Sequence, residues 1–286
     1  MSKKIIRTLA AAALAIGLAG CSSSASGSTA KADDKTIEIG ATEVPHAQIL
    51  NDVVKDLVEK DGYTLKVTVF NDYTQPNTAV DEGSLDANYF QTIRYMDEEN
   101  EERGLHLKAA AGIHLEPMGF YSKKISSLDD LKDGATIAIP NDGSNESRAL
   151  KLLADNGLIE LEDTDDLYDL TNISSNPHHY EFSEQDAANL TRVLDDVDGA
   201  VINGNYALEA DLNPSKDALF AEEADGEDAH YYINYLVVRE GNENTAKTKE
   251  LIKALQSDEV KDYIEKNYEG SVIPAFTDGD GNPINK

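Results

Sequence analysis

The sequence predicts an α/β fold for most of this 286-residue chain. Short runs with apolar residues at every second position alternate with longer runs that repeat apolar residues at three- and four-residue spacings. This alternation continues over roughly 240 residues, which is enough for a large core or for two lobes. Because strands that alternate with helices form a sheet covered by helices, we expect α/β layers. No period of 20–50 residues repeats, so a solenoid is not expected.

The N-terminus has the pattern of a lipoprotein export signal. Lys3, Lys4 and Arg7 precede the apolar run TLAAAALAIGLAG, which ends at Cys21. A basic segment followed by a short apolar one is typical of a secretory signal and is too short for a membrane span. The residues LAGC resemble a bacterial lipobox, which implies a signal peptide at 1–20 and diacylglycerol on the Cys21 thiol. The alternative is a buried cysteine in an ordinary helix.

The segment after Cys21 is small and polar, so residues 21–35 are expected to form a flexible tether between a membrane anchor and the folded part. Lipidation of Cys21 places the protein on the extracytoplasmic face of the cell membrane. Folding should begin near residue 36. The end of the chain, 277–286, is rich in Gly and Asp and is expected to be loose.

The folded part is read as strands and helices in alternation. In the first half we expect a strand at 36–42, a helix at 48–62 and a second strand at 63–70. A partly helical segment follows at 84–102, and an extended run at 112–122. In the second half we expect a short helix and a strand within 126–142, and then helices at 146–159 and 185–196. A strand leading into a helix follows at 198–210, a strongly strand-like run at 231–240, and a final helical stretch at 245–268.

Two of these extended runs are interpreted as crossings between two lobes. They lie near 112–121 and 231–239, and the chain between them is long enough to form a lobe of its own. This spacing predicts a first lobe built from 36–118 and 232–276 and a second lobe built from 119–231.

Composition argues against several classes of function. The formal net charge is −29, and the leader removes basic residues only, so the mature chain is still more acidic. Nucleic acids and anionic membrane faces reward Lys and Arg, so neither is an expected partner. The acidic residues are spread along the chain, which favours a solvated surface over a divalent-cation site.

No motif for an enzyme is present. The chain lacks a G-x-S-x-G elbow, an H-E-x-x-H pair, a glycine-rich phosphate loop and a free thiol nucleophile, so neither catalytic residues nor a cofactor are predicted. His178 and His179, with His114 or His230, leave a metal site open as an alternative to a surface loop. Adjacent histidines on an extended segment point apart, so we predict no metal site.

Three polar residues lie where a ligand would be bound. Asn203 follows the apolar run GAVI, at the end of a buried strand where open α/β sheets bind ligands. Asn234 interrupts the apolar strand YYINYLVV, where a buried amide needs a partner. Arg148 lies near the start of a helix, where a cation is disfavoured unless it binds an anion. Hydrogen bonds within a hinge, for the asparagines, and a solvated helix face, for Arg148, are the structural alternatives.

Several long motifs resemble the NlpA-type, MetQ-like methionine-binding lipoproteins of ABC importers. They are VFNDYTQPNTAVDEGSLDANYFQ, EPMGFYSKKISSLDDLKDGATIAIPND, SNESRALKLL, AVINGNYA and QSDEVKDYIEKNY. The resemblance extends from about residue 37 to 276 in the same order and spacing. It implies a two-lobed, type II periplasmic-binding-protein fold with an amino acid bound in the cleft between the lobes.

The resemblance also implies roles for single residues. Tyr73, Phe90 and Tyr95 match the aromatic residues that enclose the methionine side chain. Arg148 matches the arginine that binds the α-carboxylate, and Asn145 in the same turn is a weaker match for a polar partner. Asn203 and Asn234 match the amides that bind the α-amino and carboxylate ends.

One position departs from the family pattern. The family has histidine two residues after the phenylalanine, and here that position is Thr92, which also lines the expected site. Thr92 gives a smaller wall than an imidazole, so the expected solute is methionine or a closely related amino acid or derivative. The resemblance implies delivery to an ABC permease and its ATPase. The alternative is a surface interaction or adhesion lipoprotein whose cleft does not serve transport.

Overall fold

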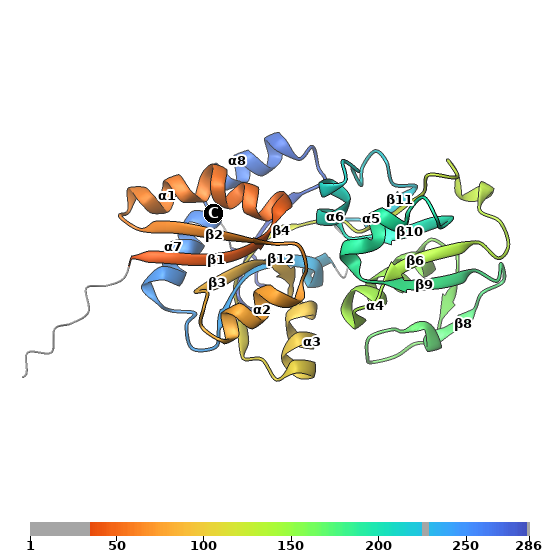
Figure 1. Ribbon diagram of the computed structural model, residues 1–286, viewed down its shortest axis with the longest axis horizontal. Helices are drawn as coiled ribbons and strands as arrows, with labels where there is room; N and C mark the ends of the chain where they lie inside the picture. The colour runs from red at the N-terminus through yellow and green to blue at the C-terminus, as the bar shows by residue number, and fades with distance from the viewer. Residues whose placement is uncertain (1–34, 225–228, 285–286) are drawn as a thin grey trace, which may run out of the picture. The chain divides into compact units, whose positions relative to one another are not determined.

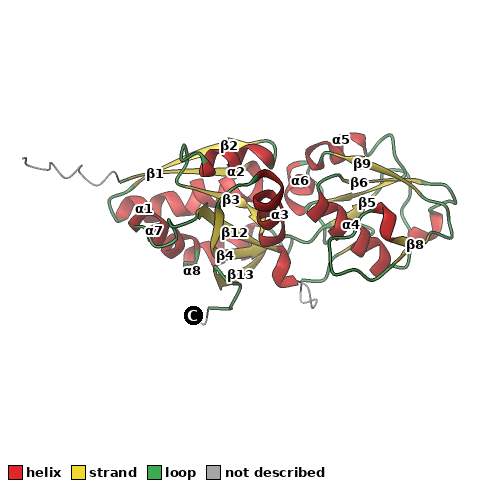
Figure 2. Ribbon diagram, turned by 90° about the horizontal axis from the view of Figure 1, so that it is seen from below, coloured by secondary structure: helices red, strands yellow, loops and turns green. Residues whose placement is uncertain are grey.

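The computed structural model describes residues 35–224 and 229–284, and most of their strands belong to two separate sheets. The predicted signal peptide at 1–20, Cys21 and nearly all of the tether lie outside the described residues. Helices cover both faces of each sheet, as Figures 1 and 2 show. The expected α/β class is therefore confirmed.

The first sheet has six strands in the order β13-β4-β12-β3-β1-β2. Their bounds are Thr36–Thr42 for β1, Thr64–Phe70 for β2, Ala87–Thr92 for β3, Leu107–Leu115 for β4, Ile233–Arg239 for β12 and Ile273–Asp278 for β13. Strand β1 pairs in parallel with β2 and β3, whereas β12 is antiparallel to β3 and β4. The C-terminal part of the chain thus returns to the sheet that the N-terminal part began.

Two groups of helices cover this sheet. One face packs against a group formed by η1 (Glu43–Ala47), η2 (Leu50–Val54), α1 (Lys55–Lys60), α7 (Ala246–Leu255) and α8 (Asp258–Asn267). The other face packs against α2 (Thr74–Asp81) and α3 (Ile93–Arg103). The predicted period-two residues Ile37 and Ile39 are both 0% exposed, so they contribute fully to the core between β1 and the first group.

The second sheet has five strands in the order β11-β5-β10-β6-β9. Their bounds are Gly119–Tyr121 for β5, Thr136–Pro140 for β6, Glu181–Gln185 for β9, Gly199–Ile202 for β10 and Phe220–Ala221 for β11. Helix α4 (Gly143–Asp155) packs on one face, and α5 (Leu190–Val193) and α6 (Gly204–Glu209) pack on the other. Short helical turns η3 (Leu128–Asp130), η4 (Leu170–Asn172), η5 (Ala187–Asn189) and η6 (Ala229–Tyr232), with the small β7–β8 pair (Glu160–Leu161, Ile173–Ser175), complete the described elements.

The chain passes between the sheets twice. It leaves the first sheet after β4 and enters the second at β5, and it returns between β11 and β12. Both passages fall within or beside the extended runs that were interpreted as crossings. The exact lobe bounds, 36–118 with 232–276 and 119–231, stay a prediction.

The segment 84–102, which was expected to be partly helical, contains the strand β3 followed by most of the helix α3. One expectation differs from the structure. The end of the chain was expected to be loose from residue 277, but β13 continues to Asp278. Beyond it, the Asp278 carboxylate accepts from Asn282, and Ile284 donates its N–H to Phe276. Within the described residues, no helix has the length and apolar character that a membrane crossing needs.

Candidate ligand-binding cavity

Polar and aromatic side chains from both sheets line one cavity. The empty space between the lining atoms, part of which is open to solvent, is about 340 Å³. Several of the lining residues lie where strands end: Thr92 closes β3 and Asn203 follows β10. All eight predicted ligand-binding residues line this cavity: Tyr73, Phe90, Thr92, Tyr95, Asn145, Arg148, Asn203 and Asn234.

Aromatic rings form one wall of the cavity. The ring of Tyr73 lies 5.6 Å from those of Phe90 and Tyr95, and the Phe90 and Tyr95 rings are 6.1 Å apart. A fourth ring, that of Tyr206 on α6, lies 4.9 Å from Tyr73. These separations are those of edge-to-face and tilted aromatic pairs. The arrangement offers a flat-sided apolar space to a ligand side chain.

Thr92 begins helix α3. Its hydroxyl oxygen accepts a hydrogen bond from the Tyr95 backbone N–H at 3.3 Å, so threonine serves as the N-cap. Thr92 is 9% exposed and is one of the residues that line the cavity. The residue that departs from the family pattern therefore also has a local structural role.

Arg148 lies at the polar end of the cavity and is only 6% exposed, so the alternative of a solvated helix face is wrong. Its Nε donates to Glu222 Oε1 at 2.6 Å, and its Nη2 donates to Glu222 Oε2 at 2.5 Å and to the Glu116 carbonyl oxygen at 2.9 Å. The ring of Tyr232 lies 4.2 Å from the guanidinium carbon. Nη1 makes none of these bonds. Burial disfavours the charge, but Glu222 outweighs it and raises the pKa of Arg148.

Three amides extend this polar end. Asn145 is anchored at the start of α4, where its backbone N–H and Nδ2 both donate to Asp142 Oδ1. Asn203 Nδ2 donates to Asn145 Oδ1 at 2.6 Å, whereas Asn203 Oδ1 is buried and has no hydrogen-bond partner. Asn234 Oδ1 accepts from His46 Nε2 at 3.1 Å. The unpartnered Asn203 oxygen is available to a ligand donor.

Four further lining residues were missed from the sequence: Gln91, Glu116, Gly204 and Asn205. Gln91 is held inside a buried amide network with Asn77 and Asn88. Glu116 follows the apolar run of β4, and Asn205 follows Asn203 by two residues. The argument that identified Asn203, a polar residue directly after a buried strand, applies equally to Glu116.

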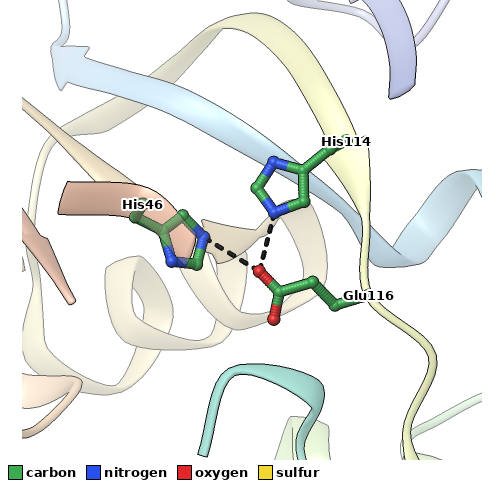
Figure 3. Close-up of side chains that lie close together, drawn as sticks. All are labelled: His46, His114 and Glu116. Carbon is green, nitrogen blue, oxygen red and sulfur yellow. Dashed lines mark hydrogen bonds and ion pairs between the residues drawn. The ribbon is translucent and has the colours of Figure 1, made fainter. Parts of the chain in front are cut away.

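Glu116 is part of a buried trio with two histidines. Figure 3 shows His46 and His114 turned toward one oxygen of the Glu116 carboxylate. His114 Nε2 lies 2.6 Å from Glu116 Oε1, and His46 Nε2 lies 3.3 Å from the same atom. Burial lowers the pKa of His46 to about 4 and that of His114 to about 3. Both imidazoles are therefore neutral near pH 7.

The outer contacts of the imidazoles determine where each proton lies. Tyr89 OH is 2.5 Å from His114 Nδ1, and Thr42 Oγ1 is 2.8 Å from His46 Nδ1. With each hydroxyl donating to Nδ1, both Nε2 atoms carry the proton. His114 Nε2 then donates to the Glu116 carboxylate, and His46 Nε2 donates to Asn234 Oδ1. Burial raises the pKa of Glu116, while His46 and Arg148 oppose that shift.

The trio is also the one group of potential metal ligands among the described residues. Two tetrahedral zinc ligands at about 2.0–2.1 Å from the ion stand roughly 3.3 Å apart, and the 2.6 Å between His114 Nε2 and Glu116 Oε1 is shorter. The geometry fits hydrogen bonding better than a shared ion. His178, considered for a metal site with His114, instead lies at the surface beside Asp133.

A broader hollow lies along α3, the start of α4 and segment 164–169. Its lining is mostly charged, and half of the lining residues are acidic, among them Asp97, Glu101 and Asp165. It lacks the combination of an aromatic wall and converging polar groups that is typical of small-molecule sites. The smaller cavity is therefore the candidate site.

Comparison with known proteins agrees with this architecture. The NlpA lipoprotein family model matches residues 37–276. A probable D-methionine-binding lipoprotein MetQ of Pasteurella multocida is 38% identical over 272 residues, covering 94% of this chain and 97% of the relative. The methionine-binding lipoprotein MetQ of Bacillus subtilis is 40% identical over 250 residues, covering 86% of this chain and 90% of the relative.

A solved structure extends the likeness to three dimensions. A nutrient binding protein from Burkholderia cenocepacia bound to methionine is 44% identical, with a TM-score of 0.80, and covers 84% of this chain and 100% of its own. The type II periplasmic-binding-protein fold is thereby confirmed, and the relatives are binding lipoproteins, not enzymes. This chain belongs to the NlpA lipoprotein family.

Proposed function

We propose that this protein binds methionine, or a closely related amino acid, in the cavity between the aromatic wall and Arg148. The observation that carries the proposal is the pairing of these two ends in one small cavity. Three rings offer an apolar space, in which sulfur–ring contacts contribute about 0.3–1.5 kcal/mol each. At the other end, Arg148 keeps its Nη1 hydrogens for a carboxylate.

The relatives support this choice of ligand. Two of them are named for binding methionine or D-methionine, and the solved Burkholderia cenocepacia structure holds methionine. In this proposal Tyr73, Phe90 and Tyr95 enclose the ligand side chain, and Thr92 widens the wall where the family has histidine. Asn145, Asn203 and Asn234 supply polar contacts at the α-carbon end.

The proposed biological role is delivery of the bound amino acid to a membrane ABC permease with its ATPase. Lipid on Cys21 would hold the protein at the extracytoplasmic face of the cell membrane, and the tether would give the folded part reach. Ligand that contacts residues from both sheets favours the arrangement in which they enclose it, through its differential affinity for that state. The alternative role as an adhesion lipoprotein has no observation of its own among the described residues.

A thermal-shift screen tests the proposal. A binding protein gains stability by RT ln(1 + [L]/Kd), about 2.7 kcal/mol at a ligand concentration of 100 Kd. We expect methionine, as the D- or the L-form, to raise the melting temperature, and we expect Arg148→Ala to abolish the shift. Because Arg148 is buried and paired with Glu222, this variant should also unfold at a lower temperature than the wild type.

Native mass spectrometry of the purified protein is the complementary measurement, since it identifies any solute carried through purification. A flat thermal response to all twenty amino acids, both enantiomers and short methionine dipeptides, together with no retained solute, would contradict the proposal and favour the adhesion role.

A further inference from the structure

The side-chain amide of Asn234 has an oxygen that accepts and a nitrogen that donates, and its neighbours determine which of them faces the cavity. Asn234 lines the cavity, and its Oδ1 atom accepts from His46 Nε2 at 3.1 Å. Among the hydrogen bonds between the described residues, none involves Asn234 Nδ2, and this nitrogen is not one of the fully buried polar atoms that lack a partner. The Nδ2 hydrogens are therefore the end of the amide that is open to the cavity.

The position of one proton fixes this orientation. His46 Nε2 lies 3.3 Å from Glu116 Oε1 as well as 3.1 Å from Asn234 Oδ1. Without a proton, the Nε2 lone pair would face the Glu116 carboxylate, which is repulsive where little water screens the two groups. With the proton, Nε2 is a donor, and the Asn234 oxygen must turn toward it. Glu116 thus determines the tautomer of His46, and His46 determines the orientation of Asn234.

The surroundings of His46 support the same tautomer. The imidazole is 1% exposed, and burial lowers its pKa to about 4, so near pH 7 the ring is neutral and carries a single N–H. Thr42 Oγ1 lies 2.8 Å from Nδ1, where its hydroxyl can donate. The rings of Tyr89 and His114 lie 4.7 and 5.0 Å from the His46 ring. These contacts hold the plane of the imidazole, so that its Nε2–H keeps pointing toward Asn234.

Glu116, in turn, is held from another direction. It is 5% exposed, and His114 Nε2 donates to the same Oε1 atom at 2.6 Å. His46 and Thr42 are not among the described residues that line the cavity. They therefore act on a ligand through the side chains that they hold, and Asn234 is the lining amide to which His46 is hydrogen-bonded.

We infer that His46 is a positioning residue, which holds the Nδ2 hydrogens of Asn234 toward the ligand and thereby selects for a free carboxylate. The inference rests on the proposed function and adds a source of ligand specificity that lies outside the cavity. A carboxylate has two accepting oxygens, one for Arg148 and one for Asn234 Nδ2. A carboxamide has one oxygen and one NH2 group. With its oxygen on Arg148, its NH2 group faces the Nδ2 hydrogens, donor against donor, and binding is disfavoured.

Calorimetry with methionine and methioninamide tests the inference. Methioninamide keeps the thioether and the α-amine but has a carboxamide in place of the carboxylate. In His46→Phe the Nε2–H is lost, and the Asn234 amide is free to turn its oxygen toward the ligand. We expect methioninamide to bind about 3- to 10-fold more tightly than to the wild type, and the preference for methionine to fall by about 10- to 100-fold. A purely structural defect would weaken both ligands, so a gain for one of them is diagnostic.

Two further variants separate the N–H group from the ring that carries it. His46→Gln keeps an N–H donor near the Nε2 position, and the Glu116 carboxylate favours the NH2 end of the new amide. This variant should keep the preference for methionine to within about threefold of the wild type. His114→Phe is the matched control, because His114 is hydrogen-bonded to Glu116 and not to Asn234. It should keep the same preference.

Nuclear magnetic resonance of the wild type gives a readout that does not depend on the folding of His46→Phe. In protein labelled with nitrogen isotope in its histidines, the ring shifts show which nitrogen carries the proton, and the signal of His46 is the one that His46→Gln removes. We expect His46 to be protonated on Nε2 and unprotonated on Nδ1 at pH 7. The opposite tautomer would overturn the inference, because Asn234 would then turn its nitrogen toward the imidazole.

The outcomes of the binding experiment separate the two proposals. If His46→Phe weakens methionine and methioninamide equally, His46 does not position Asn234, while amino-acid binding stands. The same holds if His46→Gln or His114→Phe loses the preference as fully as His46→Phe does. If the wild type binds neither methionine nor any other amino acid, the proposed function itself fails.

Discussion

The Thr92 side chain has two roles, one in the stability of a helix and one in the shape of the cavity. Its hydroxyl caps α3 through Tyr95, and the same residue forms part of the cavity wall. Histidine at this position would add a ring next to the aromatic wall but would give up a threonine N-cap. The two effects act on different measurable quantities, so they can be separated.

We expect Thr92→His to lower the free energy of unfolding by about 1 kcal/mol through loss of the cap. It should also narrow the cavity, so that methionine is favoured over its S-ethyl homologue, ethionine, more strongly than in the wild type. Chemical denaturation and calorimetry with both ligands check the two parts. Thr92→Ser keeps the capping hydroxyl and is the control for stability. An unchanged methionine-to-ethionine ratio would show that Thr92 does not set the size of the cavity.

Most of the single residues that line the cavity could be predicted from the sequence. Asn203 and Asn234 stood out because amides beside apolar strands need partners. Glu116 met the same criterion but was hidden by the abundance of acidic residues, 54 Asp and Glu in all. The environment of Arg148 was not predictable either, since Glu222 is far away in sequence and the pair forms only in the folded chain.

At the scale of helices and strands, β3 is a strand that the spacing of apolar residues does not reveal. All six of its residues are buried, because other strands flank it and helices cover both sheet faces. A strand buried on both faces shows no alternation between apolar and polar residues. Without that signal, and with a real helix following directly at α3, the segment resembled one partly helical stretch. The strands with one more polar face, such as β2, were predicted well.

A buried histidine near the end of strand β4 makes the stability of the protein depend on pH. His114 lies near the end of β4, and burial lowers its pKa from 6.5 to about 3. The unfolded chain therefore binds a proton below pH 6.5 that the native protein does not bind. By linkage, the stabilising effect of the neutral imidazole is complete above pH 6.5 and declines as the pH falls toward the folded-state value.

We expect this residue to contribute a slope of about 1.4 kcal/mol per pH unit between pH 6.5 and 4.5. The check is the free energy of unfolding of wild type and His114→Phe, measured by denaturation at half-unit steps of pH. The difference between the two should shrink as the pH falls. Glu116, whose pKa burial raises, acts in the opposite direction, and so do Glu98, Glu146 and Glu209. Only the difference between the proteins is therefore diagnostic, and parallel curves would contradict the assignment.

For the molecule as a whole, the described residues from Lys35 onward form one compact unit although they contain two sheets. Hydrogen bonds between elements of the first sheet's layers and elements of the second sheet's layers contribute to this compactness. Tyr73 lies between β2 and α2 of the first sheet, and its hydroxyl donates to Asn205 Oδ1 on α6, at 2.5 Å. A second bond links α4 to α3, where the Ser144 backbone N–H donates to Glu98 Oε2 at 2.8 Å.

The Tyr73 hydroxyl thus connects the aromatic wall to the helix that begins beside Asn203. A ligand enclosed between the two sheets can leave only when such contacts break, so this bond should lengthen its residence time. Removing the hydroxyl leaves Asn205 Oδ1 buried without its donor, which costs about 1–3 kcal/mol in the enclosed state. The open state, in which water reaches Asn205, bears little of that cost.

We therefore expect Tyr73→Phe to weaken methionine binding by about 5- to 100-fold, chiefly through faster dissociation. Tyr95→Phe is the matched control, because Tyr95 belongs to the same aromatic wall but its hydroxyl makes none of the hydrogen bonds found between the described residues. Stopped-flow measurement of the dissociation rate in both variants decides the point. Equal rates would mean that the rings alone retain the ligand, and that the bond between Tyr73 and Asn205 does not help to hold the two sheets around it.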